Sequence, residues 1–115
     1  AAISWFDCIA AGDVVPAKKP APDIYHYCLQ QLQLDAGDCL AIEDSANGLL
    51  ASTGAGITTL VTLNAYTVDD DFTQAICVVD QLGEPDAPCQ VIDGSPINTS
   101  YITAQSLQDL HAQAN

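Results

Sequence analysis

The feature that most constrains this chain is a repeated alternation of short apolar runs with helical segments. The apolar runs, each short enough for a buried strand, occupy residues 6–10, 38–43, 58–63 and 76–79. The order strand, helix, strand, helix, strand favours right-handed βαβ units around a parallel sheet. With 115 residues the chain is long enough for one domain of the α/β class, and too short for two independent cores.

Two helices are expected between these strands. The first begins near Pro22 and follows apolar side chains at four-residue spacing from Ile24 to Leu32, closing before Gly37. The second is capped by Ser45 and ended by two glycines. Its buried face is expected to contain three side chains: Leu49, Leu50 and Thr53.

Beyond Gly83 the alternation weakens, so we expect a core segment at residues 1–83 and a C-terminal extension at residues 84–115. Within the extension, residues 90–92 and 100–102 are predicted to form a small hairpin. Residues 103–111 are predicted to form a terminal helix with Leu107 and Leu110 on one face. No internal repeat is visible in the sequence.

Charge excludes several classes of partner. The chain has 15 acidic residues, two lysines and no arginine, for a net charge of −13. Such a surface repels phosphate backbones and anionic lipid surfaces, so we expect neither a nucleic acid nor a membrane as a partner. The run of acids at residues 69–71 is interpreted as a solvated loop or a helix cap.

The five cysteines favour a reducing compartment, the cytoplasm or a plastid stroma. Their number is odd, and no pair has the CxxC spacing. Cys8, Cys39 and Cys77 lie inside apolar runs and are interpreted as buried free thiols. A disulfide framework or a metal site remains an alternative.

Three features that suit a phosphate and a divalent cation are expected at the carboxyl ends of the strands. Lys18 and Lys19 follow the first strand, Glu43 and Asp44 end the second, and a helix N-terminus with unpaired backbone N–H groups comes next. Mg²⁺ prefers carboxylate oxygens, and a phosphate prefers a cation and backbone donors. Together these groups suit a Mg²⁺–phosphate complex.

Each piece also has an ordinary structural explanation. A lone pair of acids at a strand end is more often a helix cap, and a lone loop lysine is usually a solvated charge. Here the only two cations of the chain are adjacent, in a loop stiffened by proline. This clustering favours a functional role for Lys19.

Two segments carry a resemblance to a known family. Residues 19–25 (KPAPDIY) and residues 42–48 (IEDSANG) resemble the third and fourth motifs of haloacid dehalogenase-like hydrolases, in the branch of β-phosphoglucomutase and phosphoglycolate phosphatase. Lys19 and Glu43 are 24 residues apart, with one helix and one strand between them, as in the family. Within this branch the sequence is most similar to CbbY-type sugar-phosphate phosphatases of phototrophs. The resemblance covers roughly residues 5–79.

The resemblance implies a three-layer Rossmann-like parallel sheet, in which residues 6–10, 38–43 and 58–63 are the third, fourth and fifth strands. It implies that Lys19 contacts the transferring phosphate and the nucleophile. Asp44 would bind Mg²⁺, and Glu43 would be a second ligand or an acid behind it. Ser45 and Asn47 would lie beside the substrate. The reaction implied is hydrolysis of a small sugar phosphate through an aspartyl-phosphate.

The sequence departs from the family in lacking the DxDGT motif, the second-motif Ser or Thr and the helical cap domain. The resemblance is therefore to the C-terminal part of such an enzyme, without its first two strands. We expect this chain alone to be inactive, and to need an upstream segment or a partner chain both for the nucleophile and to complete the sheet. A non-catalytic binding or regulatory α/β module and a degenerate family member remain alternatives, and phosphatase versus mutase stays open.

Overall fold

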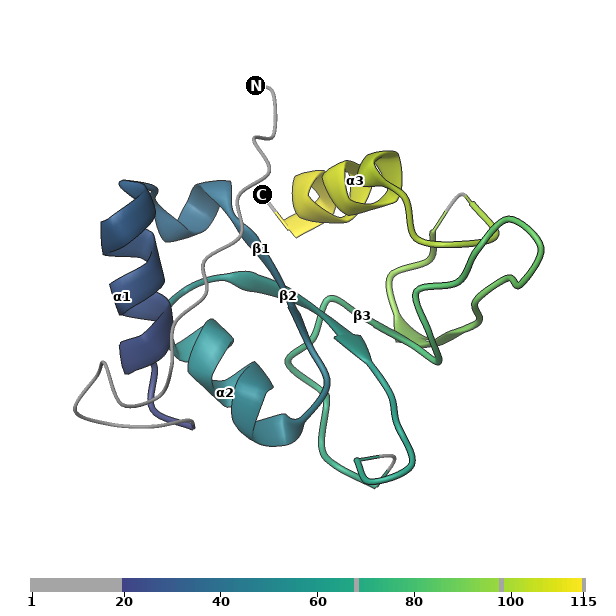
Figure 1. Ribbon diagram of the computed structural model, residues 1–115, viewed down its shortest axis with the longest axis horizontal. Helices are drawn as coiled ribbons and strands as arrows, with labels where there is room; N and C mark the ends of the chain where they lie inside the picture. The colour runs from purple at the N-terminus through teal and green to yellow at the C-terminus, as the bar shows by residue number, and fades with distance from the viewer. Residues whose placement is uncertain (1–19, 68, 98, 115) are drawn as a thin grey trace.

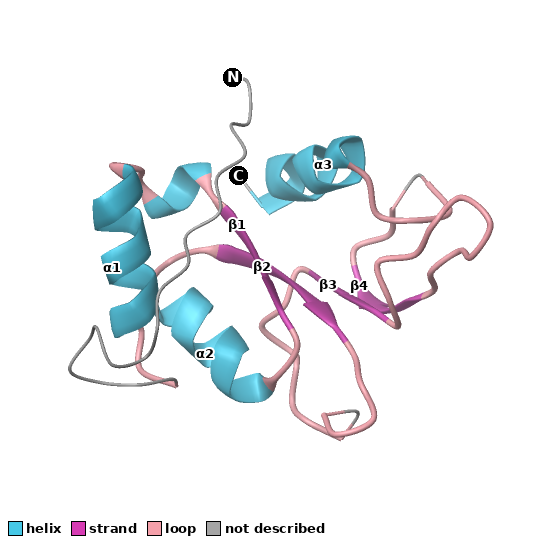
Figure 2. Cartoon of the chain, in the orientation of Figure 1, coloured by secondary structure: helices cyan, strands magenta, loops and turns pink. Residues whose placement is uncertain are grey.

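The computed structural model describes residues 20–67, 69–97 and 99–114, and they form a four-stranded sheet in the order β1-β2-β3-β4 (Figure 2). The strands are β1 (Leu40–Glu43), β2 (Thr58–Thr62), β3 (Cys77–Val79) and β4 (Val91–Gly94). β1 pairs with β2 and β2 with β3 in parallel, whereas β4 pairs with β3 in antiparallel orientation. The mostly parallel sheet confirms the α/β class. The strand predicted at residues 6–10 lies outside the described residues.

In the part of the chain that the structure describes, three α-helices and one short 3-10 turn accompany the sheet. They are α1 (Asp23–Leu32), the turn η2 (Ala36–Asp38), α2 (Ala46–Gly54) and α3 (Ala104–Ala114). α1 ends where Gln33 adopts a left-handed conformation with φ of 55°. The helices predicted from the sequence are thus confirmed, with bounds shifted by a few residues.

The first face of the sheet, here called the α2 face, is covered by α1 and α2 (Figure 1). Val61 and Val78 pack there with Leu49 of α2 and with Phe72 from the loop between β2 and β3. Nearer α1, Ala41 of β1 belongs to a second small cluster, against which Tyr25 and Leu29 pack. Because side chains alternate along a strand, Ala41 and Glu43 lie on this same face.

The opposite face, here called the α3 face, is covered in part by α3 (Figure 1). Leu60, Cys77 and Val79 form one buried cluster there with Leu107 and Leu110 of the terminal helix. The helices on both faces give the three layers implied by the resemblance. Residues beyond 84 therefore contribute to the same core as the strands.

Three sequence expectations are corrected. Leu50 is 46% exposed and does not belong to the buried face of α2. The buried residues of this helix are Gly48, Leu49, Ala51 and Ser52. The predicted hairpin does not form, because residues 91–94 pair with β3, and the Ser100 carbonyl instead accepts a bond from the Cys89 amide at 2.8 Å. Cys39 is only half-buried, whereas Cys77 is fully buried as expected, and Cys8 lies outside the described residues.

Among the described residues, no helix has the length and apolar character that crossing a membrane requires.

Candidate functional site

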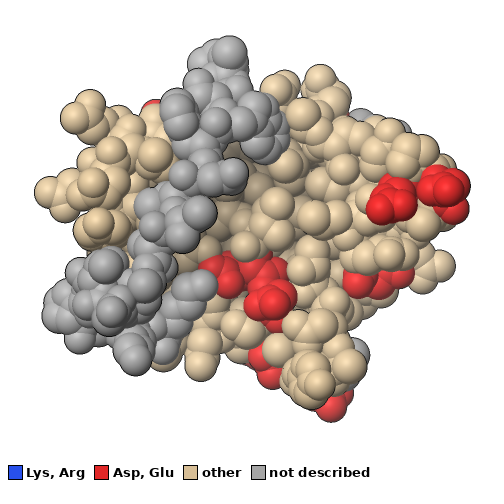
Figure 3. Space-filling view, viewed as in Figure 1, with Lys and Arg blue, Asp and Glu red and all other residues tan. Residues whose placement is uncertain are grey.

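The acid pair lies where β1 ends. Glu43 is the last residue of this parallel strand, and Asp44 is the next residue along the chain. Their environments differ: Glu43 is 8% exposed, whereas Asp44 is exposed to solvent. Figure 3 shows acidic side chains at the centre and lower edge of the view and at its right side. The pair therefore combines one buried and one solvated carboxylate.

The buried carboxylate of Glu43 is held between two helices. The Tyr25 hydroxyl of α1 donates a hydrogen bond to Glu43 Oε2. From α2, Gly48 leaves room for the carboxyl group, because a Cβ added at Gly48 would lie 2.5 Å from Glu43 Cδ. Burial, together with the bond to Glu43, raises the pKa of the Tyr25 phenol above its ordinary range. The phenol therefore stays protonated and able to donate.

The turn after Asp44 is organised by side chains that accept from the start of α2. Ser45 Oγ accepts a hydrogen bond from the Gly48 amide at 3.1 Å, which confirms Ser45 as the cap. Asp70 Oδ2 accepts a bond from the Ala46 amide at 3.0 Å. Two of the backbone N–H groups that were expected to bind a phosphate at the start of α2 therefore donate to side chains of the protein itself. Asn47 is exposed in the same turn.

A loop distant in sequence closes over this turn. Thr67, between β2 and β3, donates its hydroxyl to the backbone carbonyl of Asp44 at 2.7 Å. Of the acids at residues 69–71, Asp70 is a helix cap, as one of the two interpretations stated, whereas Asp71 accepts locally from Thr73. Sequence reasoning missed the return of this loop to Asp44. The signal was its position after the next parallel strand, at the same edge of the sheet.

The predicted cation of the site, Lys19, lies outside the described residues, as does Lys18. Because these are the only two lysines in the sequence and it has no arginine, residues 20–114 contain acidic residues but no lysine or arginine. In that part of the chain, no three His, Cys, Asp or Glu side chains are grouped closely enough to hold a metal ion. Two adjacent carboxylates are still a donor set that fits Mg²⁺, which commonly keeps several waters and uses one or two protein carboxylates.

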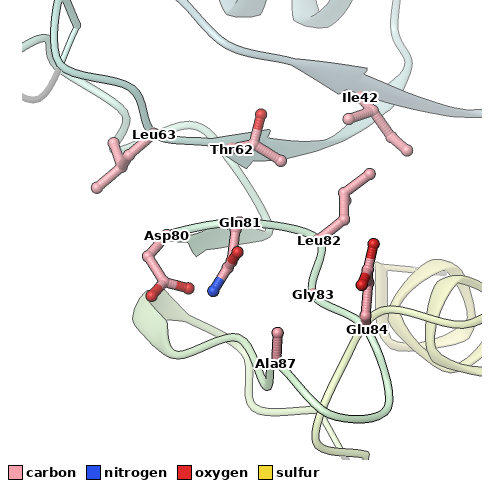
Figure 4. A pocket seen from close by; sticks show the side chains of 9 residues that line it. All are labelled: Ile42, Thr62, Leu63, Asp80, Gln81, Leu82, Gly83, Glu84 and Ala87. Carbon is pink, nitrogen blue, oxygen red and sulfur yellow. The ribbon is translucent and has the colours of Figure 1, made fainter.

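A separate cavity of about 710 Å³ opens on the α3 face (Figure 4). Its walls come from the ends of β1 and β2 and from the segment after β3, and are formed by Ile42, Thr62, Leu63, Asp80, Gln81, Leu82, Gly83, Glu84 and Ala87. Ile42 is 43% exposed and Leu82 41%. Since Ile42 and Glu43 point to opposite faces of β1, this cavity is distinct from the buried carboxylate.

Comparison with protein families gives a match to the haloacid dehalogenase-like hydrolase model over residues 2–56. This range includes both motif segments, the whole of β1 and the whole of α2. The chain is 48% identical over 83 residues to the plasmid-borne protein CbbY of Cupriavidus necator, covering 72% of this chain and 33% of that protein. It is 49% identical over 77 residues to a CBBY-like protein of Arabidopsis thaliana, covering 67% of this chain and 24% of that protein.

Among solved structures, the chain is similar to a crystal structure of a CbbY mutant from Rhodobacter sphaeroides in complex with xylulose-(1,5)bisphosphate. The TM-score is 0.62 at 41% identity, over 67% of this chain and 36% of that one. The chain thus spans about a quarter to a third of the length of these relatives.

Proposed function

We propose that this chain, which matches the haloacid dehalogenase-like hydrolase family over residues 2–56, contributes the acidic edge of a Mg²⁺-dependent phosphatase of small sugar phosphates. The observation that carries the proposal is the Glu43–Asp44 pair at the carboxyl end of a parallel strand, directly before α2. The similarity to a CbbY crystallised with xylulose-(1,5)bisphosphate supports a phosphorylated sugar as the substrate class.

In this proposal the two carboxylates have different tasks. Asp44, which is exposed, is the direct metal ligand. Glu43, which is buried and accepts from Tyr25, holds negative charge behind it and has a restricted set of orientations. When bound, Mg²⁺ would neutralise charge that develops on the phosphoryl oxygens.

Lys19 is proposed as the catalytic and phosphate-binding cation, since it is one of only two lysines in the sequence and stands in the matched family segment. Ser45 and Asn47 are proposed to contact the substrate. The Ser45 hydroxyl accepts the capping bond from Gly48, and an accepting hydroxyl keeps its proton for donation to a phosphate oxygen. Asn47 is exposed and carries an amide donor in the same turn.

The nucleophile of an aspartyl-phosphate pathway is not among these 115 residues, because the DxDGT pattern is absent from the sequence. We therefore expect residues 1–115 alone to lack turnover, and the carboxylate to come from an upstream segment or a partner chain. Cys39, Cys77 and Cys89, which form no disulfide, are consistent with the proposed cytoplasm or plastid stroma.

The test is Asp44→Asn in the protein together with the segment that carries the nucleophile. Phosphate release from xylulose-1,5-bisphosphate is measured against Mg²⁺ concentration. Loss of one ligand charge should raise the Mg²⁺ requirement and lower turnover by about 10- to 100-fold. The matched control is Asp35→Asn, which removes an exposed acid near η2. An unchanged Mg²⁺ requirement in Asp44→Asn would refute the assignment.

A further inference from the structure

We infer that Thr67 and Asp70 are positioning residues that fix the backbone around Asp44 from the loop between β2 and β3. The inference deepens the proposed function and rests on it in one respect, the assignment of Asp44 as a metal ligand. Neither residue belongs to the two motif segments of the sequence, and both lie outside the residues matched by the family model.

The loop holds the turn on both sides of Ser45. Thr67 Oγ1 donates to the carbonyl of Asp44 at 2.7 Å, and Asp70 Oδ2 accepts from the amide of Ala46 at 3.0 Å. The partners are 23 and 24 residues apart in sequence, so these are tertiary contacts. With the peptide before Ser45 and the peptide after it both bonded, the turn has little backbone freedom left.

The loop itself is anchored, which makes such positioning effective. Phe72, two residues after Asp70, is 9% exposed and packs with Leu49 and Val61 in the core of the α2 face. Farther along, the hydroxyl of Thr53 in the last turn of α2 donates to Gln74 Oε1 at 2.9 Å. The loop therefore contacts α2 at its first and last turns.

Positioning, as opposed to metal ligation, follows from what Asp70 already does. One of its carboxylate oxygens is engaged at the positive end of α2, where negative charge is favoured. Within the described residues, Asp70 does not join Glu43 and Asp44 in any group of three metal-ligating side chains. A ligand whose backbone is fixed in advance loses less conformational entropy when it binds a cation.

The experiment compares four variants of the protein. Asp70→Ala removes the acceptor of the Ala46 amide, whereas Asp70→Asn keeps an oxygen acceptor but removes the charge. Thr67→Val removes the hydroxyl at nearly constant volume. Asp69→Asn is the matched control, because Asp69 is an exposed neighbour with the same charge.

Two measurements are made on every variant: the rate of amide hydrogen exchange at Ala46, and the affinity for Mn²⁺ by electron paramagnetic resonance. For Thr67→Val, the chemical shift of the Asp44 carbonyl carbon is recorded as well. One hydrogen bond of ordinary strength corresponds to about a fivefold effect. We expect Asp70→Ala to exchange about fivefold faster at Ala46 and to bind Mn²⁺ about fivefold more weakly. In Asp70→Asn, the exchange rate and the Mn²⁺ affinity should both lie within about twofold of the unmodified protein. Thr67→Val should change the Asp44 carbonyl chemical shift and lower the Mn²⁺ affinity. Asp69→Asn should change neither the exchange rate nor the Mn²⁺ affinity.

The outcomes separate the two proposals. If Asp70→Ala, Asp70→Asn and Asp69→Asn weaken Mn²⁺ binding equally, the positioning role is wrong, and the effect comes from the loss of negative charge at a distance from the metal. Unaltered exchange at Ala46 in Asp70→Ala would also overturn it. If the unmodified protein binds no Mn²⁺, the metal assignment fails, and the positioning of the turn is decided by exchange at Ala46 and the Asp44 carbonyl shift alone.

Discussion

The two faces of β1 differ in a way that reverses the usual distribution of residues. On the α2 face, the acid Glu43 is buried, because Tyr25 supplies a donor and Gly48 supplies space. On the α3 face, the neighbouring Ile42 is 43% exposed at the rim of a cavity. Burial at this strand end is therefore set by the available partners, and hydrophobicity alone gives the wrong answer for both residues.

The polar contacts extend this contrast. On the α2 face, the buried hydroxyls of Ser52 and Thr59 bond to each other at 2.6 Å. On the α3 face, the cluster formed by the strands and α3 is apolar, with Leu60 and Leu110 almost fully buried, and the buried hydroxyl of Ser106 bonds to Thr99 and Thr103. The polar bond on the α2 face thus joins a helix to a strand, whereas the α3 face has an apolar cluster against the strands and an open cavity at the strand ends.

The largest expected effect tests whether both faces belong to one core. Leu49→Ala on the α2 face and Leu110→Ala on the α3 face should each lower the free energy of unfolding by about 2–5 kcal/mol, because each leaves a cavity beside residues that cannot fully collapse. Urea unfolding of the purified protein measures both. Leu50→Ala, at a position 46% exposed in the same helix as Leu49, is the control and should cost far less. A small effect of Leu110→Ala alone would show that α3 adds little to the core.

The next effect concerns the space beside Glu43. Gly48→Ala should destabilise the protein by about 1–3 kcal/mol, because the new Cβ collides with the buried carboxyl group. Gly54→Ala is a matched control in the same helix, where a Cβ would make an ordinary contact at 3.4 Å with Pro22. The midpoint temperature of thermal unfolding should therefore shift in opposite directions, or by clearly different amounts, in the two variants. Equal shifts would mean that the contact with Glu43 is unimportant.

A pH dependence follows from Tyr25. Its pKa is raised, so the folded protein holds the phenolic proton more tightly than the unfolded chain. This contribution is fully present below the unfolded pKa of about 10 and is lost as the pH rises above it. Tyr25→Phe should cost about 0.5–1.5 kcal/mol near neutral pH and should flatten the alkaline loss of stability.

Urea unfolding at neutral and alkaline pH measures this effect. Tyr66→Phe is the control, because Tyr66 is 96% exposed. The interpretation fails if the alkaline loss is as steep in Tyr25→Phe as in the unmodified protein.

The smallest effect is expected at the rim of the cavity. Ile42→Thr removes apolar surface that is already 43% exposed and keeps a β-branched side chain in the strand. The free energy of unfolding should change by no more than about 0.5 kcal/mol. A loss as large as that of Leu110→Ala would show that another part of the protein covers Ile42 in solution.

The local parts of this structure were predictable from the sequence. The strand before Glu43, the cap at Ser45 and the terminal helix follow from apolar periodicity and capping chemistry within short windows. The same reasoning placed the acids at a strand end, where an α/β sheet presents its ligands.

What the sequence did not reveal depends on contacts between distant segments. Nothing local to Tyr25 indicates that its hydroxyl meets Glu43, 18 residues away. Leu50 is expected inside as an apolar residue of α2, yet it is 46% exposed, whereas the adjacent Leu49 and Ala51 are buried. The pairing of residues 91–94 with β3 likewise could not be predicted. All four residues of this strand are exposed, so no alternation of buried and exposed side chains specifies its register.

The close approach of Gly48 to Glu43 links the evolutionary fates of two positions that stand on different elements. Every replacement of a glycine adds at least a Cβ, so position 48 has no conservative substitute while a long acidic side chain occupies position 43. The two sites are therefore expected to change together or not at all, and a substitution at either one carries meaning only when the residue at the other is known.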